Sequence, residues 1–321
     1  MLYAILLCLL AVASSPAQQI GTVVPRPFSA SRAGGHAVYG GLVVAPGQIV
    51  QVLVTGGIPS NLNLSASIPY PTKLGGVSAK VQQANGTVLD VPLIRVSSYA
   101  PCGGILTVFA QPCQPVAAVT LQMPYGMLVD TPFGELHQAS ALVFFKDDSA
   151  VASALITPLT DAVSVLTNCG PGGPQPASPC GPLVTHADGA PGSARAFAAG
   201  ETVVIYATGL GKINASVADG AAPAGAATTV AQVWIDFNFR ANALAVAPPL
   251  QLGIAASDGY AAPAYAGATP GYPGLYQVNV QLPSVPAGTP ACGGKVASNL
   301  TITVIGVSSF DAAPTCVAAQ P

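Results

Sequence analysis

The chain has 321 residues, of which only 7% are charged and 51% are hydrophobic, and its formal net charge is -2 at pH 7. This balance excludes the basic footprint of a nucleic-acid-binding protein, and it equally excludes an acidic disordered tail. The length leaves room for two domains of ordinary size, while 35 glycines and 31 prolines fit a chain of short strands and frequent turns.

The N-terminal residues have the features of an export signal. Leu2–Ala13 is an unbroken apolar run, and the small residues of Ser14–Ala17 that follow suit a signal peptidase. The run is too short to span a bilayer comfortably, and Leu7 rather than a small residue precedes Cys8, which disfavours a lipoprotein anchor. We therefore predict that residues 1–17 are a signal peptide. The mature chain is expected to be extracellular or periplasmic, without a transmembrane segment, and to meet an unidentified protein or glycan partner at the cell envelope.

Three stretches of the chain occur twice. In each pair, apolar residues alternate in phase with polar ones, as they do in half-buried strands. The pairs are 46–56 with 199–209, 119–124 with 278–283, and 140–145 with 298–303. The offset between the copies drifts by only a few residues, as loop insertions and deletions would produce. The pattern predicts two tandem domains, residues 18–155 and 156–321.

Further strand candidates lie between these repeats. Thr87–Arg95, Gly104–Ala110 and Val233–Phe237 are rich in residues that favour strands, and turn residues such as Asn85-Gly86 and Gly271–Gly274 separate most of the runs. Short strands, frequent turns and alternating faces together predict an all-β protein made of two tandem immunoglobulin-like β-sandwich domains.

The stretch around the expected domain boundary is less regular. Ser149–Leu166 could form a short helix, although Pro158 argues against a continuous one. Beyond it, Val163–Thr167 and Leu183–His186 are expected to pair as a hairpin.

Six cysteines remain once Cys8 is removed with the signal peptide. An even number in an exported chain indicates disulfides, although six cysteines allow fifteen connectivities. Prolines and glycines in the two shorter loops let the chain double back, and local spacing favours three pairs, Cys102–Cys113, Cys169–Cys180 and Cys292–Cys316. Each short bridge would stabilise the fold by about 3 kcal/mol. The absence of C-x2-C spacing disfavours zinc.

One part of the chain resembles a known family. The segments 200–211 (GETVVIYATGLG), 219–220 (DG), 265–267 (YAG) and 270–280 (PGYPGLYQVNV) resemble the uncharacterised C-terminal domain family of secreted Solibacter-type acidobacterial proteins. The clear copy covers about 183–306, and a weaker copy covers about 40–146. The chain departs from the family pattern at 237–251 and in its cysteine loops. The resemblance implies an exported, immunoglobulin-like module without an assigned activity, and it supplies no catalytic residues.

Catalytic and metal-binding patterns are weak. His186 and Asp188 are close in sequence, but no G-x-S-x-G elbow accompanies the three histidines, His36, His137 and His186. Asp147-Asp148 could contribute to an inter-domain calcium site, although a solvated strand end is the commoner role, and no H-E-x-x-H or calcium-loop motif occurs. Gly209-Leu210-Gly211 lacks the third glycine of a nucleotide-binding loop, so a tight turn is expected. We therefore predict no catalytic residues, no metal site and no cofactor.

Tyrosines in a Pro/Gly-rich segment are the best candidate for binding. Tyr260, Tyr265 and Tyr272 could form a platform that stacks on sugar rings or partner side chains, whereas Tyr276 is in phase with the apolar residues of its strand and belongs to the core. The leading hypothesis is a non-enzymatic exported protein with an extracellular structural or protein-interaction role. The alternative is a carbohydrate-binding or adhesion module that uses these loop tyrosines.

Overall fold

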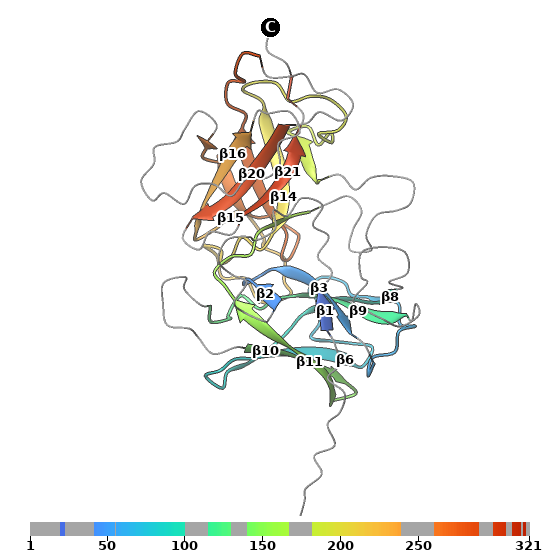
Figure 1. Cartoon of the computed structure of the whole chain (residues 1–321). Helices are drawn as coiled ribbons and strands as arrows, with labels where there is room; N and C mark the ends of the chain where they lie inside the picture. The colour runs from blue at the N-terminus through green and yellow to red at the C-terminus, as the bar shows by residue number, and fades with distance from the viewer. Residues whose placement is uncertain are drawn as a thin grey trace, which may run out of the picture.

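The computed structural model describes residues 20–22, 42–54, 56–99, 115–129, 140–166, 182–238, 260–288, 298–305, 310–315 and 317–318. Within these ranges every regular element is a β-strand, which confirms the predicted all-β class (Figure 1). In the same ranges there is no helix with the length and apolar character needed to cross a membrane.

The first half of the chain forms two sheets that enclose one core, which we call the first sandwich. Valines of β3, Leu121 of β9 and Phe144 of β10 meet between the sheets, all fully or almost fully buried. Sheet 1 has the order β1 (Ile20–Thr22), β3 (Ile49–Val54), β9 (Val116–Gln122), β8 (Leu93–Tyr99) and β4 (Leu64–Ser65). Sheet 2 has the order β2 (Leu42–Val44), β11 (Ser149–Pro158), β10 (Ser140–Lys146), β6 (Val77–Gln82) and β5 (Lys73–Leu74), with β7 (Val88–Asp90) also paired to β6.

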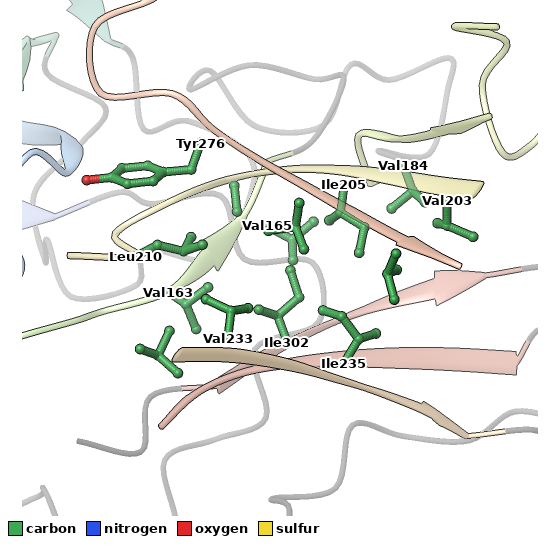
Figure 2. Close-up of a cluster of buried hydrophobic side chains, with 14 of the residues drawn as sticks. Val163, Val165, Val184, Val203, Ile205, Leu210, Val233, Ile235, Tyr276 and Ile302 are labelled. Atoms are coloured by element: carbon green, nitrogen blue, oxygen red, sulfur yellow. The ribbon is translucent and has the colours of Figure 1, made fainter. Parts of the chain in front are cut away.

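The second half forms another pair of sheets, the second sandwich, with a core of its own. Figure 2 shows aliphatic side chains of both sheets meeting in this core, with Tyr276 at one end of the cluster. Sheet 3 contains β12 (Ser164–Val165) and β13 (Val184–His186), both paired to β14 (Thr202–Thr208), followed by β19 (Tyr276–Gln281), β18 (Tyr265–Ala268) and β15 (Ala227–Thr228). Sheet 4 has the order β17 (Tyr260–Ala261), β16 (Gln232–Asn238), β20 (Ser298–Ile305) and β21 (Phe310–Thr315).

The repeated sequences occupy equivalent strands in the same register. Val50 of β3 pairs with Leu121 of β9, and the equivalent Val203 of β14 pairs with Val280 of β19. The same correspondence holds at the ends of the sandwiches, since the Leu159 amide donates to the Val44 carbonyl and the Ala318 amide donates to the Phe197 carbonyl. Register is set by which face is buried, so the matching alternation of the two copies explains the matching pairings.

Two local expectations are wrong. Ser149–Leu166 contains no helix, because 149–158 extends sheet 2 as strand β11 and pairs with both β10 and β2. Val163–Thr167 and Leu183–His186 do not form a hairpin. Instead, β12 and β13 lie end to end along the same edge of β14, where the Leu183 amide donates to the Leu166 carbonyl. The long edge of β14 offers both segments backbone partners that a short isolated hairpin would lack.

Candidate functional site at the junction of the two sandwiches

A tight turn at the start of β3 reaches the second sandwich. Gly47 has a φ of 72°, and its amide donates to the Met123 carbonyl at 2.9 Å. The side chain of Gln48 accepts the Ala45 amide through Oε1 at 2.9 Å and donates through Nε2 to the Ala162 carbonyl at 3.1 Å. One buried amide therefore closes its own turn and binds the segment that leads into the second sandwich.

The Thr208 hydroxyl makes a second link at the end of β14. It accepts the backbone amide of Ile49 from the first sandwich at 2.9 Å, and it donates to the Gly274 carbonyl within the second sandwich at 3.2 Å. Thr208 is almost fully buried, so loss of either bond would leave a polar group unsatisfied away from water.

Tyr276 extends from the core of the second sandwich toward the first. Its side chain is fully buried, and its hydroxyl bonds to the Gly211 carbonyl and lies 3.4 Å from the Pro46 carbonyl. In Figure 2 this hydroxyl points away from the aliphatic cluster. Burial raises the pKa of Tyr276 well above its ordinary value, and the neighbouring Tyr125 adds to the shift. The phenol therefore stays neutral and keeps its donor proton.

A loop of the second sandwich makes the remaining contacts. The Gly220 amide donates to Gln122 Oε1 at 2.8 Å, and the Gly220 carbonyl accepts the Tyr70 amide at 2.9 Å. Next to it, Asp219 accepts the Tyr125 amide at 2.8 Å. Burial raises the pKa of Asp219, and the bond from Tyr125 offsets part of this shift. Gly220 has a φ of 77°, and a Cβ there would lie 2.5 Å from the Tyr70 carbonyl oxygen, so only glycine fits.

The connecting segment is bound as tightly as the turns. The Ala162 amide donates to the Gly209 carbonyl at 2.7 Å. Cβ atoms at Gly209 and Gly211 would each lie 2.2 Å from a carbonyl oxygen of this segment, those of Ala162 and Thr160. Both glycines have positive φ, a conformation that glycine adopts at no steric cost, and the predicted tight turn stays a prediction. Hydrogen bonds therefore hold both the connecting segment and the ends that it joins.

The three candidate platform tyrosines do not share one sheet. Tyr260 starts β17 of sheet 4, whereas Tyr265 starts β18 of sheet 3. The Tyr265 hydroxyl donates to the Ala268 carbonyl at 2.7 Å and accepts the Ala227 amide at 3.3 Å, so it fastens the sheet edge. Tyr272 lies in the predicted turn and is 58% exposed. Of the tyrosines whose side chains are described, it is the one best placed to meet a ligand.

His186 belongs to a charged cluster that holds a loop at the far end of the second sandwich. Its Nδ1 contacts Glu201 Oε1, its Nε2 lies 3.3 Å from the Arg195 carbonyl, and its ring stacks on Phe197 with centroids 4.0 Å apart. The Arg195 guanidinium lies 3.1 Å from Asp188 and 3.3 Å from Glu201. Both ring nitrogens are engaged by the protein, so the arrangement favours a structural histidine over a general base.

The acidic pair lies away from the junction. Asp147 and Asp148 have φ values of 49° and 66° and form the tip between β10 and β11, at the opposite end of β11 from the connecting segment. Lys73 lies 2.8 Å from Asp148, and Lys146 contacts Asp147. Among the described residues no group of three His, Cys, Asp or Glu side chains could hold a metal ion.

Several sequence-based candidates cannot be placed. His36, His137, the 104–110 strand candidate and all six cysteines of the predicted bridges lie outside the described residues, so those bridges stay a prediction: Cys102, Cys113, Cys169, Cys180, Cys292 and Cys316.

Sequence reasoning missed the polar side chains of the junction. Only the alignment of Gln48 with Glu201, one amide against one acid at the same turn, hinted at their role. No protein-family model and no curated protein matches the chain by sequence.

Proposed function

We propose that the mature chain is a non-enzymatic exported protein with an extracellular structural or protein-interaction role, built from two immunoglobulin-like modules. The observation that carries this proposal is the hydrogen-bonded junction. The side-chain polar groups of Gln48, Thr208 and Tyr276 make hydrogen bonds that hold one sandwich against the other. A defined relative orientation serves a protein that spaces or presents surfaces, because the geometry exists before any partner arrives.

The resemblance to secreted Solibacter-type domains and the predicted signal peptide support the same proposal. Both indicate export, and the family pattern at 270–280 falls on the Gly274 turn and β19, which contribute to the junction. In this proposal the most family-like residues serve folding and docking rather than chemistry.

The test uses the mature chain, residues 18–321, labelled and added to cell envelopes of the native organism. We expect saturable binding that unlabelled protein competes away, and no turnover of ester, peptide or glycoside substrates. Robust turnover of any of these substrates by the purified protein would overturn the non-enzymatic role. Absence of saturable binding to envelopes would overturn the interaction role.

The carbohydrate-binding alternative rests on one observation, the exposed Tyr272 at a tight turn. It predicts saturable binding on a glycan array that weakens in Tyr272→Ala. Val230→Ala is the matched control, because Val230 is similarly exposed, at 62%, in another loop of the same sandwich. A negative array with the wild-type protein removes this alternative.

A further inference from the structure

Strand β10 is apolar on both of its faces. Leu142 and Phe144 point into the core of the first sandwich, whereas Ala141, Val143 and Phe145 alternate with them on the outer face and are only partly buried. The water-facing side of an antiparallel sheet is ordinarily polar. The outer side of β10 departs from that rule at three successive positions.

The strand register widens this apolar surface across sheet 2. One cross-strand row runs over four strands and contains Leu155 of β11, Ala141 of β10, Gln82 of β6 and Val88 of β7. Leu155 is 57% exposed and Val88 is 52% exposed. We call these residues together the outer apolar face: Val88, Ala141, Val143, Phe145 and Leu155.

The second sandwich provides an internal comparison. Phe237 pairs with Leu300 there as Val81 pairs with Leu142 in the first sandwich, so β20 corresponds to β10. Its positions equivalent to Ala141, Val143 and Phe145 are Asn299, Thr301 and Thr303. Trp234 and Phe310 are large apolar residues at one end of that face, on either side of Thr303 in the strand register. The same fold therefore forms with a polar central strand, and folding alone does not explain the apolar residues on β10.

The charged side chains beside this apolar surface are already paired with each other. Lys80 and Asp90, in the same cross-strand row as Val143, already pair with each other at 3.4 Å. Covering the row thus buries no uncompensated charge. The formal net charge of the chain is only -2, so two copies repel each other weakly.

The area of the outer apolar face indicates how strongly two copies should associate. Four strands at about 4.8 Å spacing and six residues at about 3.4 Å rise give a flat area of roughly 400 Å². Two such areas, with side-chain relief added, reach the low end of specific interfaces, at about 1,200 Å² in total. Association through this face should therefore be weak, with a dissociation constant on the order of micromolar.

We propose that the outer apolar face is covered by a second copy of this chain, with sheet 2 packed on sheet 2 about a two-fold axis. A two-fold axis brings the same patch of both copies together, and face-to-face sheet packing already joins the two sheets inside each sandwich. Figure 1 places β6, β10 and β11 on the side of the first sandwich away from the second, so the second sandwich does not obstruct this contact. The inference rests on the proposed interaction role, of which it names one partner.

The test is sedimentation velocity of the mature chain, residues 18–321, from about 1 to about 200 µM. We expect a concentration-dependent dimer. The triple variant Ala141→Asn, Val143→Thr, Phe145→Thr installs the residues of the second sandwich and should weaken dimerisation roughly 100-fold, since truncated anchor residues commonly cost tenfold or more each. Leu155→Thr, at the exposed margin of the face, should weaken dimerisation less than the triple variant does. Because it is a single exposed substitution, it tests the face even if the triple variant misfolds.

The matched control is Thr301→Ala on the equivalent strand of the second sandwich, which should leave the dissociation constant unchanged within about twofold. A wild-type monomer at every concentration would overturn the inference and leave the face to a different protein. A dimer that the triple variant and Leu155→Thr leave unaltered would overturn it as well. Neither result bears on saturable envelope binding or on substrate turnover, so the proposed function is judged separately.

Discussion

The turn before β3 and the turn before β14 share their backbone bonds but face different surroundings. In the first sandwich the Gly47 amide donates to the Met123 carbonyl, and in the second the Gly200 amide donates to the Leu282 carbonyl. Each turn is closed by a side chain that accepts an amide three residues back, Gln48 at 2.9 Å and Glu201 at 3.0 Å.

The two turns differ in the second polar atom of that side chain. Gln48 Nε2 is a donor and binds the Ala162 carbonyl, whereas Glu201 Oε1 is an acceptor and meets His186 and Arg195. An amide thus suits the end that docks against a carbonyl, and a carboxylate suits the free end, where the Arg195 guanidinium and a ring nitrogen of His186 face it. The comparison teaches that the two turns keep the same backbone bonds and differ in the chemistry of one side chain at the same position.

The largest effect is expected from the glycines of the two turns. Both have positive φ, so alanine costs about 1–2 kcal/mol at either site through the backbone alone. At Gly47 the new Cβ would also lie 2.2 Å from a ring carbon of Tyr125 and 2.8 Å from the Tyr276 hydroxyl. At Gly200 it would meet nothing within 4 Å.

We therefore expect Gly47→Ala to lower the free energy of unfolding by about 3–5 kcal/mol, against about 1–2 kcal/mol for Gly200→Ala, because overpacking adds to the backbone cost. Urea unfolding of the mature chain, followed by circular dichroism, measures both. Equal losses in the two variants would mean that the docked turn tolerates a methyl group and that the junction is looser than its contacts indicate.

Local sequence pattern was enough to predict the strands of this comparison and the place of Tyr276. Alternation at 119–124 and 278–283 predicted half-buried strands, and their apolar residues occupy the two cores in the same register. The prediction is confirmed for β19, whose alternate residues are buried, and wrong for β9, where Thr120 and Gln122 are buried as well. The apolar phase also placed Tyr276 in the core correctly, where it is fully buried.

The hydrogen bonds of the junction could not be predicted from local sequence pattern. Gln48 binds a carbonyl 114 residues away and Gln122 binds an amide 98 residues away, and a polar residue in or beside a turn looks the same in sequence whether water or protein faces it. The expected hairpin failed for a related reason, since the free edge of β14 decided the pairing of β12 and β13.

Exchanging the two side chains should have unequal effects. Gln48→Glu keeps the bond to the Ala45 amide but places an acceptor against the Ala162 carbonyl, at a site that is 1% exposed. We expect a loss of about 2–3 kcal/mol in unfolding free energy at neutral pH. Glu201→Gln also keeps its turn closed, and because the Glu201 side chain is itself partly exposed, the substitution should cost less than about 1 kcal/mol.

Unfolding measurements on both variants and on Gln48→Met separate the buried charge from the lost hydrogen bond. If Gln48→Met is as costly as Gln48→Glu, the charge is not the cause. Small-angle scattering adds a direct readout, since a broken junction should increase the radius of gyration of Gln48→Glu while leaving that of Glu201→Gln unchanged.

The smallest effect is a difference in pH dependence between the two ends. Burial alone would raise the pKa of Glu201, but the Ala198 amide together with His186 and Arg195 holds it below its ordinary value of 4.5. A carboxyl with a depressed pKa contributes stability that is present above the unfolded value and is lost as pH falls through the folded value. Asp219 at the junction has the opposite shift, because burial raises its pKa, so its protonation favours the folded state as pH falls.

These opposing contributions partly cancel in the wild-type protein, and the variants separate them. From about pH 4.5 downward, the unfolding free energy of wild type should fall more steeply than that of Glu201→Gln, and less steeply than that of Asp219→Asn. Parallel curves for wild type and Glu201→Gln would show that the carboxylate at the free end carries no folding-linked proton. In that case the acid differs from Gln48 only in hydrogen-bond polarity, and the asymmetry of the two ends is one of donors and acceptors rather than of charge.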